Sequence, residues 1–184
     1  MRPVILYIPG LGDGYDHFRR PSLRAWRLFG VNAQLVPITW FDGGDFTAKY
    51  ALVEAAIREQ RIRGRAVVLV GESAGATLAL HAAARHPDLR RVITLCGVAR
   101  RNTPIAARLR RKAPALDTAV ATLPEQFVAP VVSLRAAVDH VVGARYSSAV
   151  GAETRVIWSI GHLLTISLCL TLLSPYLIRQ CLRP

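Results

Sequence analysis

The sequence has few acidic residues and almost no lysine. It holds 12 Asp and Glu against 24 Lys and Arg, a net charge of +12 at pH 7, and Lys49 and Lys112 are its only lysines. A surface this basic can attract nucleic acid or anionic lipid. No signature of a nucleic-acid-binding module accompanies the charge, so we favour a solvated, arginine-rich surface over a nucleic acid or membrane partner.

Cysteine is scarce as well. Cys96, Cys169 and Cys181 are odd in number, and each lies in an apolar run. This pattern argues against a framework of disulfides and indicates reduced, buried thiols. We therefore expect a cytoplasmic protein.

No apolar run reaches the ~20 residues that a membrane-spanning helix needs. Segment 163–178 comes nearest, but Pro175 interrupts it, and we expect it to form a buried last helix. The apolar run over residues 4–8 is short and has no small-residue cleavage site after it. It is interpreted as a strand rather than as a signal peptide.

What the sequence does contain is an alternation of strand-like and helix-like runs, with no internal repeat or linker. We expect strands over 4–8, 33–38, 66–70, 92–95, 131–134 and 155–158, and helices over 22–29, 46–63, 74–85, 144–150 and from 163 onward. The alternation predicts an α/β fold, a mostly parallel, doubly wound sheet of about six strands with helices on both faces. The length suits a single domain over 1–184. Segment 97–129 is the least regular, and we expect one or two short helices there, over the edge of the sheet.

The stretch VVLVGESAGATLALHAAARH, residues 67–86, carries the strongest motif. Four apolar residues lead into Gly71-Glu72-Ser73-Ala74-Gly75, and an alanine-rich helical run follows. A very tight strand-to-helix turn holds such a serine in a strained conformation and lifts its hydroxyl above the sheet, with glycine needed two residues before and after it. The context predicts a nucleophilic Ser73. The alternative is a glycine-rich turn that only packs tightly.

A nucleophilic serine needs a base, and the base needs a group that orients it. His162 follows a strand directly, at the edge of the sheet where Ser73 is expected, so it is the candidate base; a helix-start residue with a local hydrogen bond is the alternative. Asp139 also follows a strand and is the candidate acid, against a turn or helix-capping aspartate. Asp117 lies in the irregular segment and Glu153 precedes its strand, so both are poorer candidates.

The loop Pro9-Gly10-Leu11-Gly12-Asp13-Gly14 follows the first expected strand. An oxyanion hole needs two N–H donors aimed at the developing charge, and the backbone N–H groups of Leu11 and Ala74 are the predicted pair. A phosphate-binding loop is the alternative, but the lysine of a P-loop and the full spacing of a dinucleotide loop are missing. Weaker candidates for contact with substrate are Gly10, Gly12, Tyr15, His17 and Trp40.

These features together resemble the α/β-hydrolase superfamily over nearly the whole chain. The matching pieces are IPGLGDG after the first strand, VGESAG at the turn, Asp139 after a strand, and Gly161-His162 before the last helix. The resemblance implies a triad of Ser73, Asp139 and His162, with Leu11 and Ala74 at the oxyanion hole. The first two strands of a full-size member are missing, and the segment that usually carries a lid is reduced to 97–129. Pro9 replaces the usual histidine before the oxyanion loop.

By this resemblance we expect a compact, nearly lidless serine esterase. It would cleave small-molecule carboxylic esters with short to medium acyl chains through an acyl-serine intermediate, with no metal or organic cofactor. One alternative is the same triad acting on a thioester or peptide, or in acyl transfer. A more distant alternative is a non-catalytic binding protein that uses the arginine-rich surface.

Overall fold

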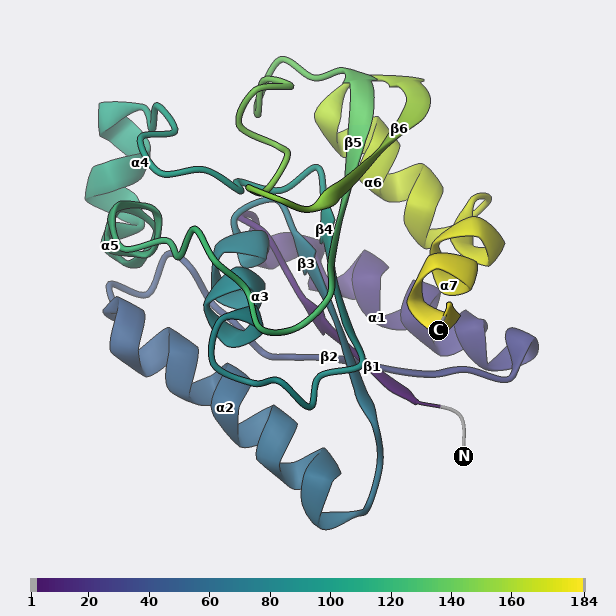
Figure 1. Cartoon of the computed structure of the whole chain (residues 1–184). Helices are drawn as coiled ribbons and strands as arrows, with labels where there is room; N and C mark the ends of the chain where they lie inside the picture. The colour runs from purple at the N-terminus through teal and green to yellow at the C-terminus, as the bar shows by residue number, and fades with distance from the viewer. Residues whose placement is uncertain (1–2, 184) are drawn as a thin grey trace.

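The computed structural model describes residues 3–183 and contains one six-stranded sheet (Figure 1). The strand order is β2-β1-β3-β4-β5-β6, and every neighbouring pair is parallel, which confirms the predicted fold class. The strands are β1 (Val4–Ile8), β2 (Asn32–Leu35), β3 (Val67–Glu72), β4 (Arg91–Leu95), β5 (Val131–Val138) and β6 (Glu153–Ile160).

The central strands are apolar without alternation because helices cover both of their faces. All five residues of β1 and all six of β3 are buried. In a parallel sheet the chain must cross from one strand to the next through a connection on a face of the sheet, so both faces become covered.

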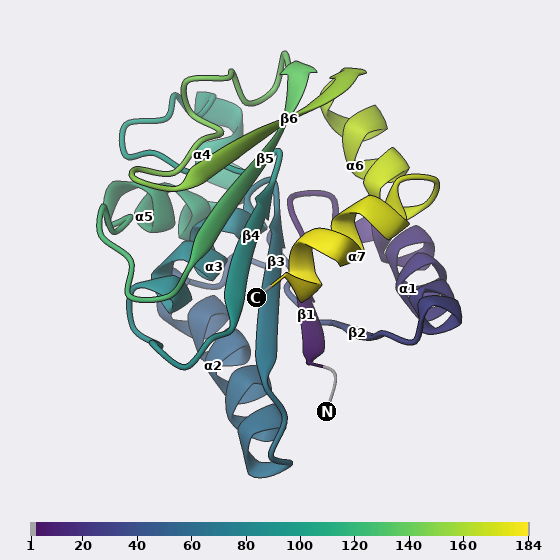
Figure 2. The same ribbon diagram turned by 45° about the vertical axis from the view of Figure 1, so that its right-hand side comes forward.

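Helices lie on both sides of the sheet (Figures 1 and 2). One face packs against α2 (Phe46–Ile62) and α3 (Gly75–Ala83), and α5 (Pro114–Ala121) joins the same hydrophobic cluster. The other packs against α1 (Asp16–Ala25), α6 (His162–Leu170) and α7 (Ser174–Leu182). The remaining elements are α4 (Ala107–Lys112) and two short 3-10 helices, η1 (Asp13–Tyr15) and η2 (Trp26–Phe29).

The irregular segment 97–129 forms two short helices, as predicted, but α5 does not lie over the edge of the sheet. It packs on α2 and α3, where Leu116 and Val120 are buried. The Ala119 carbonyl oxygen also lies 3.1 Å from the Nε2 atom of His81 on α3. An apolar face therefore places α5 in a second layer outside the helices.

Three helix predictions need correction. No helix forms over 144–150: the amide of Ala149 donates to the hydroxyl of Ser133 on β5 at 3.0 Å, which holds this stretch in turns against the sheet. The helix expected over 22–29 begins earlier, at Asp16, and its last turn is the separate 3-10 helix η2. The last helix is two helices, α6 and α7, bent by 74° at a break over 171–173.

No single helix among residues 3–183 has the length and apolar composition to cross a membrane. Only α6 and α7 taken together meet those two criteria, and they are sharply bent.

Candidate active site

Ser73 sits in the tight turn between β3 and α3, with a left-handed φ of 50°. Its amide donates to the carbonyl oxygen of Leu95 at 2.9 Å. A Cβ at Gly71 would lie 2.6 Å from the Cα of Ala76, and one at Gly75 would collide with the carbonyl oxygen of Ile8. Only glycine lets the strand, the turn and the helix approach so closely, which explains the spacing of the motif.

The structure brings Ser73, His162 and Asp139 together from three separate parts of the chain. The Nε2 atom of His162 lies 2.9 Å from the Ser73 hydroxyl oxygen, and its Nδ1 atom lies 2.8 Å from Oδ2 of Asp139. A carboxylate can only accept, so Nδ1 carries the proton and Nε2 is free to accept the hydroxyl hydrogen. This arrangement orients a base toward a hydroxyl.

Two backbone amides hold the carboxylate of Asp139. Its Oδ1 atom accepts from Val141 at 2.8 Å and from Val142 at 2.9 Å. Burial alone would raise the pKa of Asp139, but the hydrogen bonds from His162 and from these amides lower it below its ordinary value. Asp139 is therefore ionised at neutral pH.

Gly161 places His162 at the first position of α6. It has a φ of 99°, and its amide donates to the carbonyl oxygen of Val138 at 2.8 Å. The left-handed residue ends β6 and turns the chain over the end of the sheet toward Asp139, which follows β5 directly. Glycine adopts this conformation without steric cost.

The loop after β1 approaches the serine closely at Gly10. A Cβ at Gly10 would lie 2.6 Å from the Cβ of Ser73. Neither the Leu11 amide nor the Ala74 amide donates a hydrogen bond to any residue in the described range 3–183. The two amides are therefore unpaired within these residues, as predicted donors of an oxyanion hole must be.

Comparison with known proteins gives the fold. No protein-family profile matches the chain. Phytyl ester synthase 2, chloroplastic, of Arabidopsis thaliana is 32% identical over 90 residues, which is 47% of this chain and 12% of that protein. The chain thus spans about an eighth of the length of this curated relative.

Solved structures match almost the entire chain. One of the metagenome-derived lipolytic enzymes LipS and LipT superposes with a TM-score of 0.68 at 15% identity, over 98% of this chain and 96% of that one. The pyrethroid hydrolase PytH gives 0.67 at 14% identity, with 96% of each chain covered. A Xanthomonas campestris pv. campestris protein assigned to the α/β-hydrolase superfamily gives 0.64 at 19% identity, over 98% and 99%. This chain has the α/β-hydrolase fold.

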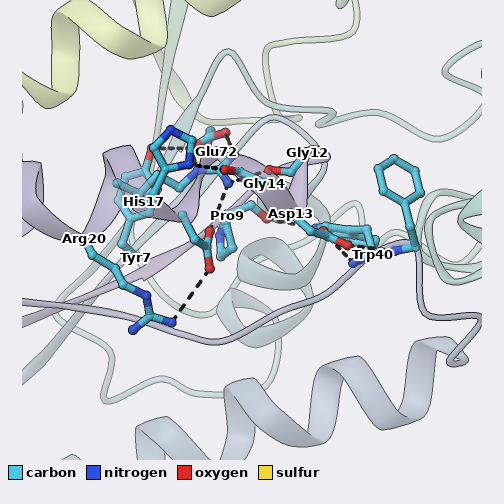
Figure 3. A network of polar contacts seen from close by, with 12 residues as sticks. Tyr7, Pro9, Gly12, Asp13, Gly14, His17, Arg20, Trp40 and Glu72 are labelled. Atoms are coloured by element: carbon cyan, nitrogen blue, oxygen red, sulfur yellow. Dashed lines mark hydrogen bonds and ion pairs between the residues drawn. The ribbon is translucent and has the colours of Figure 1, made fainter.

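The protein also contains a buried network that the sequence did not predict (Figure 3). The Arg19 guanidinium donates to both carboxylate oxygens of Glu72, at 2.9 and 2.6 Å. The hydroxyl of Tyr7 donates to Glu72 at 2.7 Å, and Arg19 also donates to the Gly12 carbonyl oxygen at 3.0 Å. Burial, followed by the charge of Glu72, raises the pKa of Tyr7 well above its ordinary value. Glu72, an acidic residue next to Ser73, could have indicated a buried ion pair. Nothing in the sequence shows which of the nearby arginines is its partner.

A second set of contacts fixes the opposite side of the loop after β1 (Figure 3). The Asp13 carboxylate accepts from the amides of Trp40 and Phe41, at 2.9 and 3.2 Å. The indole N–H of Trp40 donates to the Pro9 carbonyl oxygen at 3.0 Å. Trp40 has no exposed surface, so it supports the loop from below rather than lining a surface open to substrate.

The other predicted contact residues lie near the loop in different settings. Gly12 has a φ of 100°, and a Cβ there would lie 2.6 Å from the Tyr15 ring. Tyr15 is half exposed and lines a small cavity of about 50 Å³ with Leu163. His17 is exposed, and its Nδ1 atom contacts the Gly14 carbonyl oxygen rather than any residue of the triad.

Cys96, Asp139 and His162 place a sulfur, an oxygen and a nitrogen within 4.8 Å of one another, the spacing of a metal site. The donors do not suit one. Asp139 and His162 are hydrogen-bonded to each other, and burial raises the pKa of Cys96 to about 12. A thiol must be deprotonated to bind a metal, so Cys96 is a poor ligand here.

Proposed function

We propose that this protein, which has the α/β-hydrolase fold, is a serine esterase that cleaves carboxylic esters through an acyl-serine intermediate, with Ser73, His162 and Asp139 as its triad. One observation carries the proposal. The Ser73 hydroxyl, the His162 ring and the Asp139 carboxylate form a continuous chain of hydrogen bonds, in the chain order typical of this fold.

In the proposed first step, His162 Nε2 takes the hydroxyl proton as Ser73 Oγ attacks the acyl carbon. The imidazolium that forms is stabilised by ionised Asp139 through Nδ1–H. The amides of Leu11, on the loop after β1, and of Ala74, in the turn before α3, donate to the oxyanion, and because both are backbone groups they need little reorganisation. Pro9 in place of the usual histidine leaves these donors unchanged.

The tetrahedral intermediate then collapses. His162 protonates the leaving alcohol, and the acyl group stays on Ser73. Water enters, loses a proton to His162 and attacks the acyl carbon, which releases the acid and restores the serine hydroxyl. Atoms and charge balance without a metal or organic cofactor.

The surroundings of the triad support an apolar acyl group. Val141, next to the Asp139 turn, is 67% exposed, and Leu163 and Leu164, directly after His162, are 53% and 55% exposed. These exposed apolar side chains, together with the shortness of segment 97–129, favour a substrate with a short to medium acyl chain. The lipolytic enzymes and the pyrethroid hydrolase that share this fold support an ester rather than a peptide.

Acyl transfer is the second candidate. The curated relative is named a phytyl ester synthase, and transfer differs from hydrolysis only in which nucleophile, an alcohol or water, attacks the acyl-serine. A panel of ester and thioester donors, with and without added alcohol, separates the two by product analysis.

We also propose a cytoplasmic location, because Cys96, Cys169 and Cys181 are free and buried. A nucleic acid or anionic membrane partner remains the less favoured use of the basic surface.

Labelling with a fluorophosphonate probe tests the catalytic proposal without knowledge of the substrate. The probe reacts with a serine that has both an activating base and an oxyanion hole. We expect an adduct on Ser73, located by mass spectrometry and absent from the folded Ser73→Ala variant. Failure to label folded wild-type protein would reject the serine-hydrolase assignment and favour a binding role for the fold.

A further inference from the structure

A cavity of about 550 Å³, separate from the triad residues, is lined by three arginines. Arg100 and Arg101 come from the segment after β4, and Arg145 comes from the turns after β5. Glu125 is the one acidic side chain among the described residues that line it, and its Oε1 atom lies 4.0 Å from Nε of Arg101, which leaves Arg100 and Arg145 without a carboxylate partner in the cavity. The cavity therefore carries an excess of positive charge from two separate segments.

Backbone contacts hold two of these arginines in place through their Nε atoms and leave their terminal nitrogens for a ligand. The Nε atom of Arg100 donates to the Ser148 carbonyl oxygen at 2.6 Å, and that of Arg101 donates to the Leu123 carbonyl oxygen. Within residues 3–183, no hydrogen bond from the terminal nitrogens of either guanidinium is found. Arg145 lies over the ring of Tyr146, 5.8 Å from its centroid. Planar guanidinium forks with free N–H groups match the two oxygens of a carboxylate or phosphate.

A backbone hydrogen bond ties one wall of the cavity to Ser73, and a second bond ties the other wall to the first. The Val98 amide donates to the Ser73 carbonyl oxygen at 3.0 Å, and the next residue, Ala99, donates to the Tyr146 carbonyl oxygen at 2.8 Å, which joins the two walls. Arg100 follows at once, and a chain extends by at most about 3.6 Å per residue, so the backbone of Arg100 lies within about 10 Å of the Ser73 carbonyl oxygen.

We propose that this cavity binds an anionic group of the substrate, so that the substrate is an acyl ester with a carboxylate or phosphate remote from the scissile bond. The inference rests on the proposed esterase function. The ester lies at Ser73, and the terminal anion binds Arg100, Arg101 and Arg145. This also gives part of the arginine-rich surface a role beyond solubility.

A pair of matched esters tests the proposal. Para-nitrophenyl octanoate and mono-para-nitrophenyl suberate share their chain length and differ in a terminal carboxylate. We expect wild-type protein to prefer the suberate in kcat/KM, and Arg145→Gln and Arg100→Gln each to reduce that preference about tenfold or more, since each loses charge-assisted hydrogen bonds. Inorganic pyrophosphate should inhibit octanoate hydrolysis competitively if the cavity also takes phosphate.

Arg58→Gln on α2 is the matched control, because it removes the same charge from an exposed site outside the cavity. It should leave the preference unchanged. An equal effect of Arg58→Gln, or a wild-type protein with no preference and no inhibition by pyrophosphate, would overturn the cavity proposal. If neither ester is cleaved and the fluorophosphonate does not label Ser73, the esterase proposal fails instead. Calorimetric titration with pyrophosphate then decides the cavity alone: binding that Arg100→Gln abolishes supports it, and no binding overturns it.

Discussion

Arg19 binds both carboxylate oxygens of Glu72, the residue immediately before Ser73. The pair is deeply buried, with 3% and 2% of the two side chains exposed. Because the same guanidinium also holds the Gly12 carbonyl oxygen, it ties the loop after β1 to the turn that carries the serine. The spacing between the proposed oxyanion donors thus depends on a residue that touches neither donor.

Removal of Arg19 should destabilise the protein strongly. Arg19→Met leaves the Glu72 charge buried without its partner, and we expect the free energy of unfolding to fall by about 3–5 kcal/mol in urea titrations. Arg63→Met, which removes the exposed partner of Glu59, should lower the free energy of unfolding by about 0–1 kcal/mol. The double variant with Arg19→Met and Glu72→Gln should lose less free energy of unfolding than the two single variants lose together. Strict additivity would contradict a coupled pair.

Gly10→Ala should impair turnover of an ester substrate. The added methyl group would lie 2.6 Å from the Cβ of Ser73 and 2.9 Å from the Glu72 carbonyl oxygen, so the loop or the turn must move. We expect kcat to fall by about 10²–10³, the loss typical of one misplaced oxyanion donor. Gly14→Ala in the same loop meets no atom within 4 Å and is the control. A similar loss of kcat in both variants would show that the close approach at Gly10 is not the cause.

Asp139 should make stability depend on acidity. Its pKa is lower in the folded protein than in the unfolded chain, so its contribution is complete above the ordinary value of about 3.9 and is lost as pH falls through the folded-state pKa. We expect the difference in free energy of unfolding between wild type and Asp139→Asn to be constant near neutral pH and to shrink below about pH 4. Urea titrations across this range measure it. A difference that grows on acidification would have the wrong sign for a lowered pKa.

The thiols should be inert in the folded state. Burial raises the pKa of Cys96 and of Cys169 to about 12, and it also raises the pKa of Cys181. At pH 8 we expect no reaction with a disulfide reagent in native protein and reaction of all three after denaturation. Rapid modification of the native protein would contradict the buried placement.

The sequence was most informative where the folded structure restricts the residue types within a short stretch of chain. Residues 67–75 predicted a strand, a turn and a helix because a buried strand must be apolar and a tight turn must have glycine at fixed positions. The order of Ser73, Asp139 and His162 along the chain, each after a strand, placed all three at one edge of a parallel sheet, and the structure brings them within hydrogen-bond distance.

Prediction failed where a contact with a distant residue decides the conformation. Residues 144–150 have helix-like composition, yet the Ser133 hydroxyl on β5 accepts a hydrogen bond from the Ala149 amide, and this contact holds the stretch in turns. The apolar run after His162 predicts one helix, but the chain bends between α6 and α7. Both helices then pack on the same face of the sheet. Local propensity is a weak prior that packing overrides.

The sequence by itself determined the class of fold, the nucleophile motif and the candidates for base and acid, because periodicity and glycine spacing are properties of a short stretch of chain. Only the tertiary structure decided which of many arginines pairs with Glu72, that Trp40 supports the loop from inside the core, and that Arg100 and Arg145 share one cavity. Those contacts depend on which segments meet after folding, and the residues next to a charged side chain in the sequence do not identify its partner.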